Sequence, residues 1–284
     1  MKKTKFLLFI VLSLSIFFIY SCSKDEKQIK IVKQINQTEE LISTYVEAKN
    51  ALEIGDYYLA SKKFLEAEIL FPQSQWAPKS LIMASYSYYL QDYYNESIRS
   101  LKRYLENYPN DKNLVYARYL LALNYFELIE GEKRDIAAIF LAKEQFQLIV
   151  KNFPNTEYAL DSRYKINLLN DLLAAKEIYL GRYYIKKQKW IPALNRFKEV
   201  IDNYETTIYV EEAIHRMVEI NYKLGLVDES KKYASLLGYN YQSSQWYKET
   251  FKIFNKNYSI PIKQNQKNKK GLIKQFKNFF NQNE

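Results

Sequence analysis

One side chain in this sequence combines nucleophilic chemistry with an unusual position: Cys22, the only cysteine in 284 residues, stands where an apolar run stops and a polar stretch begins. A disulfide within the chain is excluded, because there is no second cysteine. His215 is the only histidine, and one imidazole without a cysteine partner cannot build a typical zinc site. The sequence also has no glycine-rich phosphate loop, no HExxH motif and no second imidazole to activate a nucleophile. It therefore predicts neither catalysis nor a bound metal.

The amino terminus has the layout of a secretory signal. Residues 1–5 are cationic, and residues 6–20 are apolar apart from two serines. This apolar run is shorter than the roughly 20 residues that a spanning helix needs. We predict a cleaved signal peptide over residues 1–21, with an uncleaved amino-terminal anchor as the alternative.

The residues around Cys22 give the thiol a function. The stretch "IYSC" resembles a bacterial lipobox, in which the cysteine is acylated and the signal is cleaved just before it, although its two outer positions differ from the usual Leu-Ala-Gly-Cys form. The resemblance implies a lipid on Cys22, the only covalent group expected, and no other cofactor. Ser23 follows where an aspartate would favour the inner membrane, so we expect the outer membrane. Residues 22–38 are polar and are predicted to form a lipidated tether.

Charge is unevenly distributed. The formal net charge is +10, but the excess comes from the first five residues and from six lysines after Tyr258. The rest of the chain nearly balances acids and bases, which argues against nucleic-acid binding. The acidic pairs Glu39 with Glu40 and Glu211 with Glu212 lie among lysines, and we predict that they face solvent.

Four segments of the chain end alike: "EAEILFPQS", "RYLENYPND", "LIVKNFPNT" and "EVIDNYETT". Each is an apolar helical pattern that closes on an aromatic residue followed by stop signals. The stretch "GDYYLASKKFLEAEILFP", which runs into the first ending, matches the tetratricopeptide pattern of 34-residue helical hairpins: Gly55, Ala60, Phe64, Ala67 and Pro72. Five such units begin at positions 41, 78, 115, 174 and 211. The sequence therefore predicts an all-α, tetratricopeptide-like solenoid of five helical hairpins.

The third spacing is longer than the others and indicates two changes. Residues are inserted inside the third hairpin, around "IEGEKRDIAAIF", and the first helix of the fourth unit is lengthened to about residues 158–187. We expect units 1–3 over residues 39–157 and units 4 and 5 over residues 158–258. The tail over residues 259–284 is basic. We expect it to be either a disordered end or an amphipathic helix that rests on an anionic surface or docks to a partner. Its apolar residues share one side of a helical wheel: Leu272, Ile273, Phe276, Phe279 and Phe280.

Signal, lipobox, five hairpins and the long helix together resemble the BamD family of lipoproteins, a subunit of the outer-membrane β-barrel assembly machine. The resemblance covers about residues 41–254 and is strongest in "YPNDKNLVYARYLLALNYF" and in the stretch from "NFPNTEYALDSRYKINLL" to "KWIPALNRFKEVIDNYETTIYVEEA". It implies a periplasm-facing scaffold that binds the BamA-type POTRA/barrel subunit, other assembly-machine lipoproteins and unfolded outer-membrane proteins. The alternative is a repeat lipoprotein of another envelope system, such as a secretin or pilus pilotin.

Positions that line the concave face of this repeat are rich in rings in the first three units. We predict a groove for an extended, partly apolar peptide, with lysines suited to a terminal carboxylate. Its residues are Tyr45, Lys49, Lys79, Tyr86, Tyr89, Tyr116, Tyr119 and Phe126. The alternative, equally open, is that these rings pack between neighbouring helices.

The stretch "KWIPALNRF" opens the second helix of the fourth unit. The family resemblance implies that Arg196 meets the POTRA-bearing subunit, where an arginine can pair with a carboxylate. We assign Trp190 to the same partner-binding surface. The alternative for Arg196 is an ordinary solvated charge.

Overall fold

The structure is a computed structural model that describes residues 25–70, 72–131 and 136–254, with side chains described from residue 39 onwards. The predicted signal peptide, Cys22 and the basic tail over residues 259–284 lie outside the described residues. The backbone of residues 25–38, expected as a tether, is helical and continues into the first hairpin.

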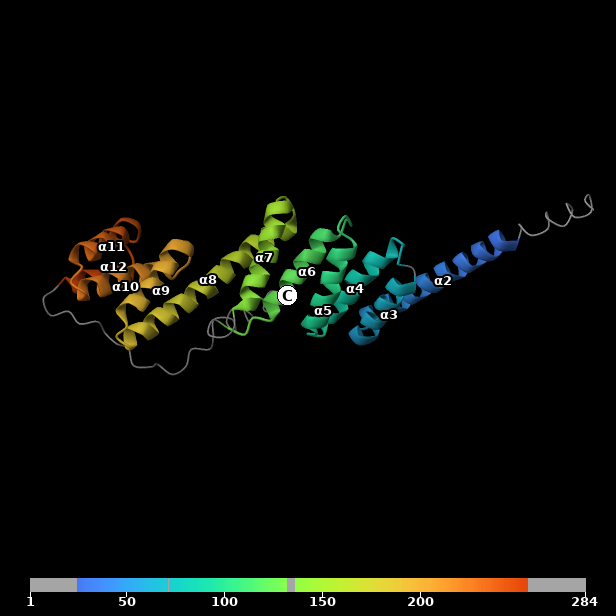
Figure 1. Cartoon of the computed structure of the whole chain (residues 1–284), viewed down its shortest axis with the longest axis horizontal. Coiled ribbons are helices and arrows are strands. Elements are labelled where there is room, and N and C mark those ends of the chain that lie inside the picture. Colours follow the sequence, from blue (N-terminus) through green and yellow to red (C-terminus); the bar gives the residue numbers. More distant parts are fainter. Residues whose placement is uncertain (1–24, 71, 132–135, 255–284) are drawn as a thin grey trace, which may run out of the picture. The chain divides into compact units, whose positions relative to one another are not determined.

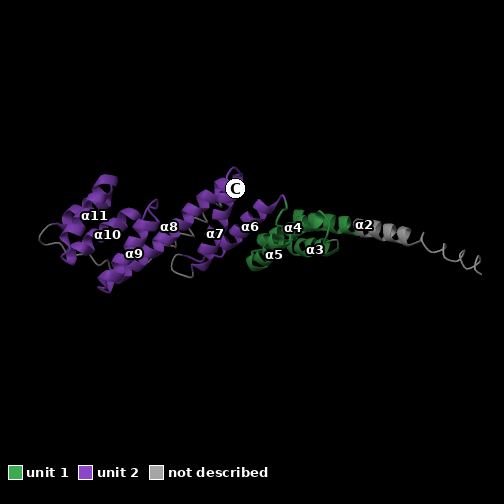
Figure 2. Cartoon of the chain, turned by 45° about the horizontal axis from the view of Figure 1, so that its top comes forward, with its two compact units in different colours: residues 1–111 green, residues 112–284 purple. Residues whose placement is uncertain are grey.

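The described residues fold into helices, with no strand among them, and form two compact units (Figures 1 and 2). Unit 1, which ends at Asp111, contains α2 (Asp25–Glu53), α3 (Tyr57–Leu70), α4 (Trp76–Leu90) and α5 (Tyr94–Asn107). Unit 2 contains α6 (Leu114–Glu127), α7 (Ala137–Asn152), α8 (Glu157–Lys186), α9 (Trp190–Asn203), α10 (Val210–Lys223), α11 (Val227–Asn240) and α12 (Gln245–Ile253). Consecutive helices from α2 to α11 make the five hairpins, so the predicted all-α repeat architecture is confirmed.

The second helix of each hairpin is held by three inward positions spaced i, i+4 and i+7, which we call the inner triplet. Such positions lie on one face of a helix, so a single stripe meets the core. In the first four hairpins all members are fully buried: Ala60, Phe64 and Ala67; Ser97, Leu101 and Tyr104; Ala142, Phe146 and Ile149; Ala193, Phe197 and Val200. In the fifth, Ser230 and Leu237 are fully buried and Ala234 is half-buried.

The turns inside the hairpins share a left-handed residue at the same repeat position. Gly55 and Gly225 have φ of 84° and 78°, and Asp92 and Gln188 adopt φ of 61° and 58° at the corresponding sites. Glycine reaches this region without strain, whereas other residues do so at a cost. The third hairpin instead has the longer connection over residues 128–136, where the insertion was predicted; residues 132–135 of it are not described.

Helix α8 has 30 residues, as the sequence predicted for the fourth unit. It begins where the Thr156 hydroxyl accepts a hydrogen bond from the backbone N–H of Ala159 at 3.2 Å, a typical N-cap. Its first half packs on α7 and its second half on α9, so α8 joins the third hairpin to the fourth within unit 2. None of the described helices is both long and apolar enough to cross a membrane.

Candidate protein-binding surfaces

Tyr45 lies in the core of the first hairpin. Its ring is buried, with edge-on contacts to Phe64 at 5.3 Å and to Trp76 at 4.9 Å between centroids. The Lys79 ammonium lies over the rings of Tyr45 and Trp76, 5.2 Å from each centroid. The packing interpretation therefore holds for Tyr45, while Lys79 is exposed and presents a cation on an aromatic base.

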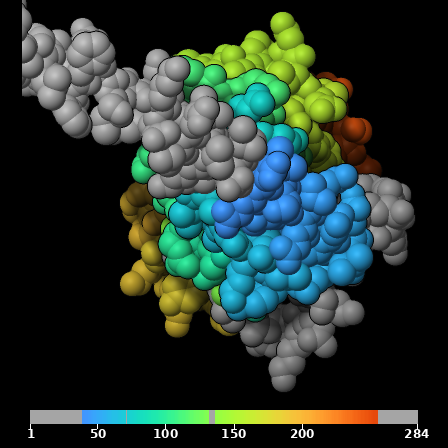
Figure 3. All heavy atoms as spheres, turned by 90° about the vertical axis from the view of Figure 1, so that its right-hand side faces the viewer, coloured from blue at the N-terminus to red at the C-terminus, as the bar shows by residue number. Residues whose placement is uncertain are grey.

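The other predicted groove residues of unit 1 lie at or near the surface. Lys49 is exposed and pairs with Glu53 at 3.2 Å, a contact of little energetic weight in water. Tyr86 is half-buried, and so is Tyr89, whose ring lies 5.9 Å from that of Tyr94. In Figure 3 the coloured atoms of α2, from residue 39 onwards, and those of α3 form the blue part of this side. Unit 1 thus keeps the partly accessible rings of Tyr86 and Tyr89 on α4, the helix that also carries Lys79.

The predicted groove residues of the third hairpin join α6 to α8. They are Tyr116, Tyr119 and Phe126. Tyr158 of α8 packs its ring against Tyr116 at 6.0 Å and Tyr119 at 5.1 Å, and the Tyr119 hydroxyl donates to Asp161 at 2.7 Å. The Lys165 ammonium lies 4.9 Å from the centroid of Phe126. These three rings are half-buried and serve helix packing, at least in part.

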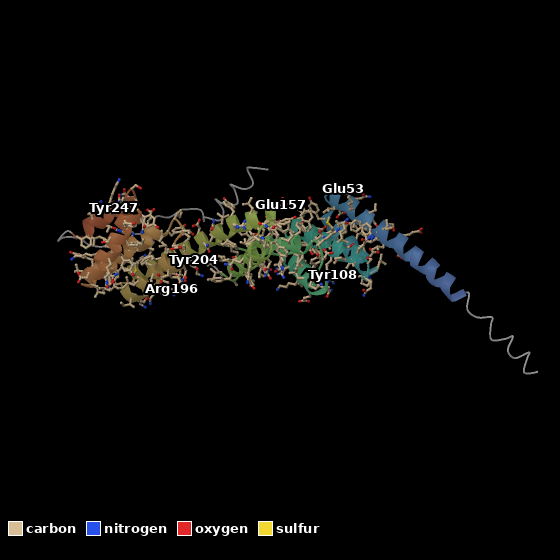
Figure 4. The ribbon with its side chains drawn as sticks, turned by 90° about the horizontal axis from the view of Figure 1, so that it is seen from above. Glu53, Tyr108, Glu157, Arg196, Tyr204 and Tyr247 are labelled. Atoms are coloured by element: carbon tan, nitrogen blue, oxygen red, sulfur yellow. The ribbon has the colours of Figure 1, made fainter. Side chains whose placement is uncertain are left out.

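Arg196 and Trp190 both lie on α9 and both contact neighbouring helices; Figure 4 labels Arg196 on this helix. The Arg196 guanidinium donates to Glu177 of α8 at 3.1 Å, and 41% of its side chain remains exposed. Trp190 packs on the core shared by α8, α9 and α10, with the Lys223 ammonium 5.1 Å above its ring. Arg196 is therefore a pre-oriented cation that a second carboxylate can still reach.

Apolar side chains gather beside Trp190 at the turns of the fourth and fifth hairpins. Ile191 is 61% exposed, and Leu224 and Leu226 are exposed as well. Because Lys223 reaches over Trp190, these two turns are neighbours. We call the set Trp190, Ile191, Leu224 and Leu226 the turn edge.

A buried charge network crosses from α8 to α10. Arg182 donates from two nitrogens to Glu212, and Arg216 approaches Glu212 at 3.6 Å and pairs with Glu219. Glu212 is only 4% exposed, so the prediction that the Glu211 and Glu212 pair faces solvent is wrong for Glu212. The two arginines compensate its charge, which is what allows a carboxylate to be buried.

His215 is buried between α10 and α12. Its Nδ1 lies 2.9 Å from the Thr250 hydroxyl, which itself donates to the Trp246 carbonyl at 2.9 Å. The Thr250 hydroxyl thus lies between the ring and that carbonyl, and the direction of the hydrogen bond to Nδ1 depends on the tautomer of His215. The ring also lies 5.1 Å from that of Trp246. The histidine fastens α12, and among the described residues no set of histidine, cysteine and acidic groups is arranged to hold a metal.

Sequence reasoning missed the two tryptophans that cover Tyr45 and His215. The signal was present, because "SQW" occurs at residues 74–76 and again at residues 244–246, at the start of α4 and of α12. It was overlooked because both copies precede the first position of the repeat.

Comparison with known proteins identifies the family. The model of the YfiO family, described as an outer membrane lipoprotein, matches residues 37–237. The outer membrane protein assembly factor BamD of Rickettsia prowazekii is 41% identical over 218 residues, which cover 77% of this chain and 86% of that protein. BamD of Caulobacter vibrioides is 36% identical over 236 residues, covering 83% and 76%, and BamD of Neisseria gonorrhoeae is 32% identical over 200 residues, covering 67% and 74%. A tetratricopeptide repeat protein from Parabacteroides merdae aligns with a TM-score of 0.38 and 15% identity, over 77% of this chain and 73% of that one. From the family match and the relatives' identities, the chain belongs to the BamD (YfiO) family, and the resemblance found in the sequence is confirmed.

Proposed function

We propose that the protein is an outer-membrane lipoprotein that serves as a scaffold for the assembly of β-barrel proteins. The observation that carries the proposal is the 41% identity, over 77% of the chain, to an outer membrane protein assembly factor. The same similarity favours this role over that of a secretin or pilus pilotin. The scaffold works by binding and positioning, with no enzymatic step and no cofactor beyond the lipid on Cys22, which anchors it at the periplasmic face.

We assign the contact with the POTRA/barrel subunit to Arg196 and the turn edge. Glu177 fixes the Arg196 guanidinium in place, so little side-chain entropy remains to be lost when a partner carboxylate binds. The turn edge adds apolar area, with Ile191 61% exposed. Arginine and tryptophan are among the residue types that are enriched at interface hot spots.

We assign the binding of unfolded clients to unit 1. Lys79 offers a cation held over two rings, which suits the carboxylate at the end of a chain, and Tyr86 and Tyr89 offer ring surface for apolar side chains. Rigid rings give contact area at low entropic cost, which suits many related client segments.

Depletion of the protein from cells tests the role. Folded outer-membrane porins should fall, while inner-membrane proteins keep their normal amounts. Porin levels that stay normal after depletion would contradict the proposal, and loss of pili alone would favour a pilotin.

The partner surface is tested by pulling down the full-length protein from detergent-solubilised membranes. Arg196→Glu should lose the barrel subunit, whereas Lys198→Glu, an exposed basic residue on the same helix, should retain it. Equal recovery of the barrel subunit with both variants would remove Arg196 from the interface. Cys22→Ala tests the anchor separately, because the processed variant should leave the membrane fraction.

A further inference from the structure

Lys143 of α7 is a half-buried lysine that, in the part of the chain the structure describes, pairs with no carboxylate. Its ammonium instead lies 5.8 Å from the ring centroid of Tyr204, at the end of α9. Burial lowers the pKa of this ammonium, and a neighbouring carboxylate would have opposed that shift. Lys63 of unit 1 is half-buried too, but its ammonium lies 3.1 Å from Glu47 and 3.2 Å from Glu66. Lys143 is therefore a partly desolvated cation that can still receive an anion.

The packing of the repeat does not require a cation at this position. Lys143 directly follows Ala142, the first member of the inner triplet of α7. In the fifth hairpin the corresponding residue is Lys231, which is exposed and lies 3.8 Å from the Asp228 carboxylate. A charge that leaves water without a partner lowers stability. Uncharged side chains, buried or half-buried, hold the position in the first, second and fourth hairpins: Ser61, Ile98 and Leu194.

The contact between Lys143 and Tyr204 bridges the third and fourth hairpins, whose second helices α7 and α9 both pack on α8. Figure 4 labels Tyr204 in this unit. The ring of Tyr204 packs on the core shared by α8, α9 and α10. The backbone is held as well, because the N–H and the hydroxyl of Thr207 donate to the Tyr204 carbonyl at 3.0 Å and 2.8 Å. A fixed ring therefore supports the ammonium where the two hairpins meet.

Each of the two segments that meet at this contact also presents a large exposed apolar side chain. Phe140 precedes Lys143 by three residues on α7, so the two are neighbours on one side of that helix, and 51% of Phe140 is exposed. Ile208 follows Tyr204 by four residues and is 74% exposed. Its backbone N–H donates to the Asp171 carboxyl, which holds this loop against α8. The surface thus combines one cation with apolar side chains from two hairpins.

We propose that Phe140, Lys143, Tyr204 and Ile208 form a docking site for a segment of a partner protein that carries a carboxylate beside an apolar side chain. The carboxylate pairs with the Lys143 ammonium, and the apolar side chain covers Phe140 and Ile208. Charge complementarity selects this occupant, because a basic segment would be repelled and a purely apolar one would bury the ammonium further without an anion. The site does not depend on the role proposed above, since it requires only this chemistry in a partner.

Zero-length cross-linking in membranes that contain the full-length protein tests the proposal. A carbodiimide joins an amine to a carboxylate with which it is in contact, and mass spectrometry of the digested product locates the bond. We expect an amide between the Lys143 side chain and an aspartate or glutamate of another polypeptide, next to an apolar residue of that polypeptide. Lys143→Arg should abolish the bond, because a guanidinium does not form this amide.

Two matched substitutions test the apolar part of the site. Phe140→Gln should lower the yield of the Lys143 bond about tenfold, because covering a phenylalanine ring contributes binding energy of that order. Tyr58→Gln is the control, since Tyr58 is 57% exposed and occupies the corresponding position of α3. It should leave the yield unchanged.

Four results would overturn the proposal. The first is an amide from Lys143 to an acidic residue of its own chain, such as one in the connection over residues 128–136, and the second is an amide to another copy of the chain. The third is the absence of any amide at Lys143, and the fourth is a yield that Phe140→Gln leaves unchanged. Porins that fall on depletion in spite of such a result would leave the proposed function in place, so the two failures are distinguishable.

Discussion

Replacing Gly181 by alanine tests the packing that holds the fourth hairpin together. Gly181 lies in α8 directly beneath the ring of Phe197, the central member of the inner triplet of α9. A Cβ at this position would lie 2.5 Å from Cζ and 2.6 Å from Cε1 of that ring. Phe197 is fully buried in the core of this hairpin, so the new methyl group must either displace the ring within that core or move α8 and α9 apart.

Two opposing effects set the magnitude. Overpacking a well-ordered core costs about 1–3 kcal/mol. Alanine in place of glycine inside a helix stabilises by about 1 kcal/mol. Because a fully buried ring blocks the new methyl group, we expect the upper half of the packing range and a net destabilisation of about 1–2 kcal/mol for Gly181→Ala. If Phe197→Leu first removes the ring, the same Gly181→Ala change should stabilise by up to about 1 kcal/mol. The sign of the effect therefore reverses between the two backgrounds.

Urea unfolding of the four proteins, followed by circular dichroism and tryptophan fluorescence, measures the coupling. Trp190 packs on the same core and reports locally. Gly238→Ala is the matched control, because the ring above Gly238 is that of the half-buried Tyr247, which can move aside. A stabilising Gly181→Ala in the wild-type background, or equal effects with and without Phe197, would refute the packing argument.

Three other substitutions follow from the turns and the buried charges. Gln188→Gly should raise the free energy of unfolding by about 0.5–1 kcal/mol in thermal unfolding, because relief of the left-handed backbone at φ 58° outweighs the larger entropy that glycine loses on folding. No gain would mean that the turn is unstrained. Glu212→Gln should lower the free energy of unfolding in urea by about 2 kcal/mol. This loss is smaller than is usual for a broken buried ion pair, because Arg216 still pairs with Glu219. An unchanged midpoint would show that the network is dispensable. Burial raises the pKa of the Asp171 carboxyl, although the backbone N–H of Ile208 opposes the rise, so folding favours the protonated form. That contribution to stability is present below about pH 4 and is lost as the pH rises through the raised pKa. Asp171→Asn should therefore raise the urea midpoint at pH 7, and the gain should shrink towards pH 4. A gain that does not depend on pH would contradict this account.

The repeat could be predicted from the sequence because its determinants are local. The three positions of each inner triplet lie within seven residues of one second helix, and they face the core in every hairpin. The length of α8 was predictable for a similar reason, since residues 158–187 contain no proline and only Gly181 as a helix-weakening residue. Gly181 itself is tolerated because the ring of Phe197 occupies the space that a side chain at residue 181 would fill.

The surfaces were less predictable, because they depend on partners far apart in the chain. Repeat position alone gave Tyr45 and Tyr86 the same expected role, yet Tyr45 is buried under Trp76 and Tyr86 is half-exposed. Glu212 looked like a solvated acid until Arg182, thirty residues earlier, was brought against it by the packing of α8 on α10. A periodic pattern shows which side of a helix a residue occupies, and only the neighbouring helix decides whether that side is covered.

The same repeat position is used differently in the first and the fifth hairpin. The fifth position is Tyr45 in the first hairpin, where a ring packs under Trp76 and carries the Lys79 ammonium at the surface. In the fifth hairpin it is His215, whose ring lies 2.9 Å from the Thr250 hydroxyl and 3.5 Å from the Glu219 carboxylate, which itself pairs with Arg216. Ring stacking tolerates small shifts, whereas charged hydrogen bonds specify one geometry. The ring at this position of the first hairpin is therefore used in packing, and the proposed binding of clients by unit 1 rests on Lys79, Tyr86 and Tyr89.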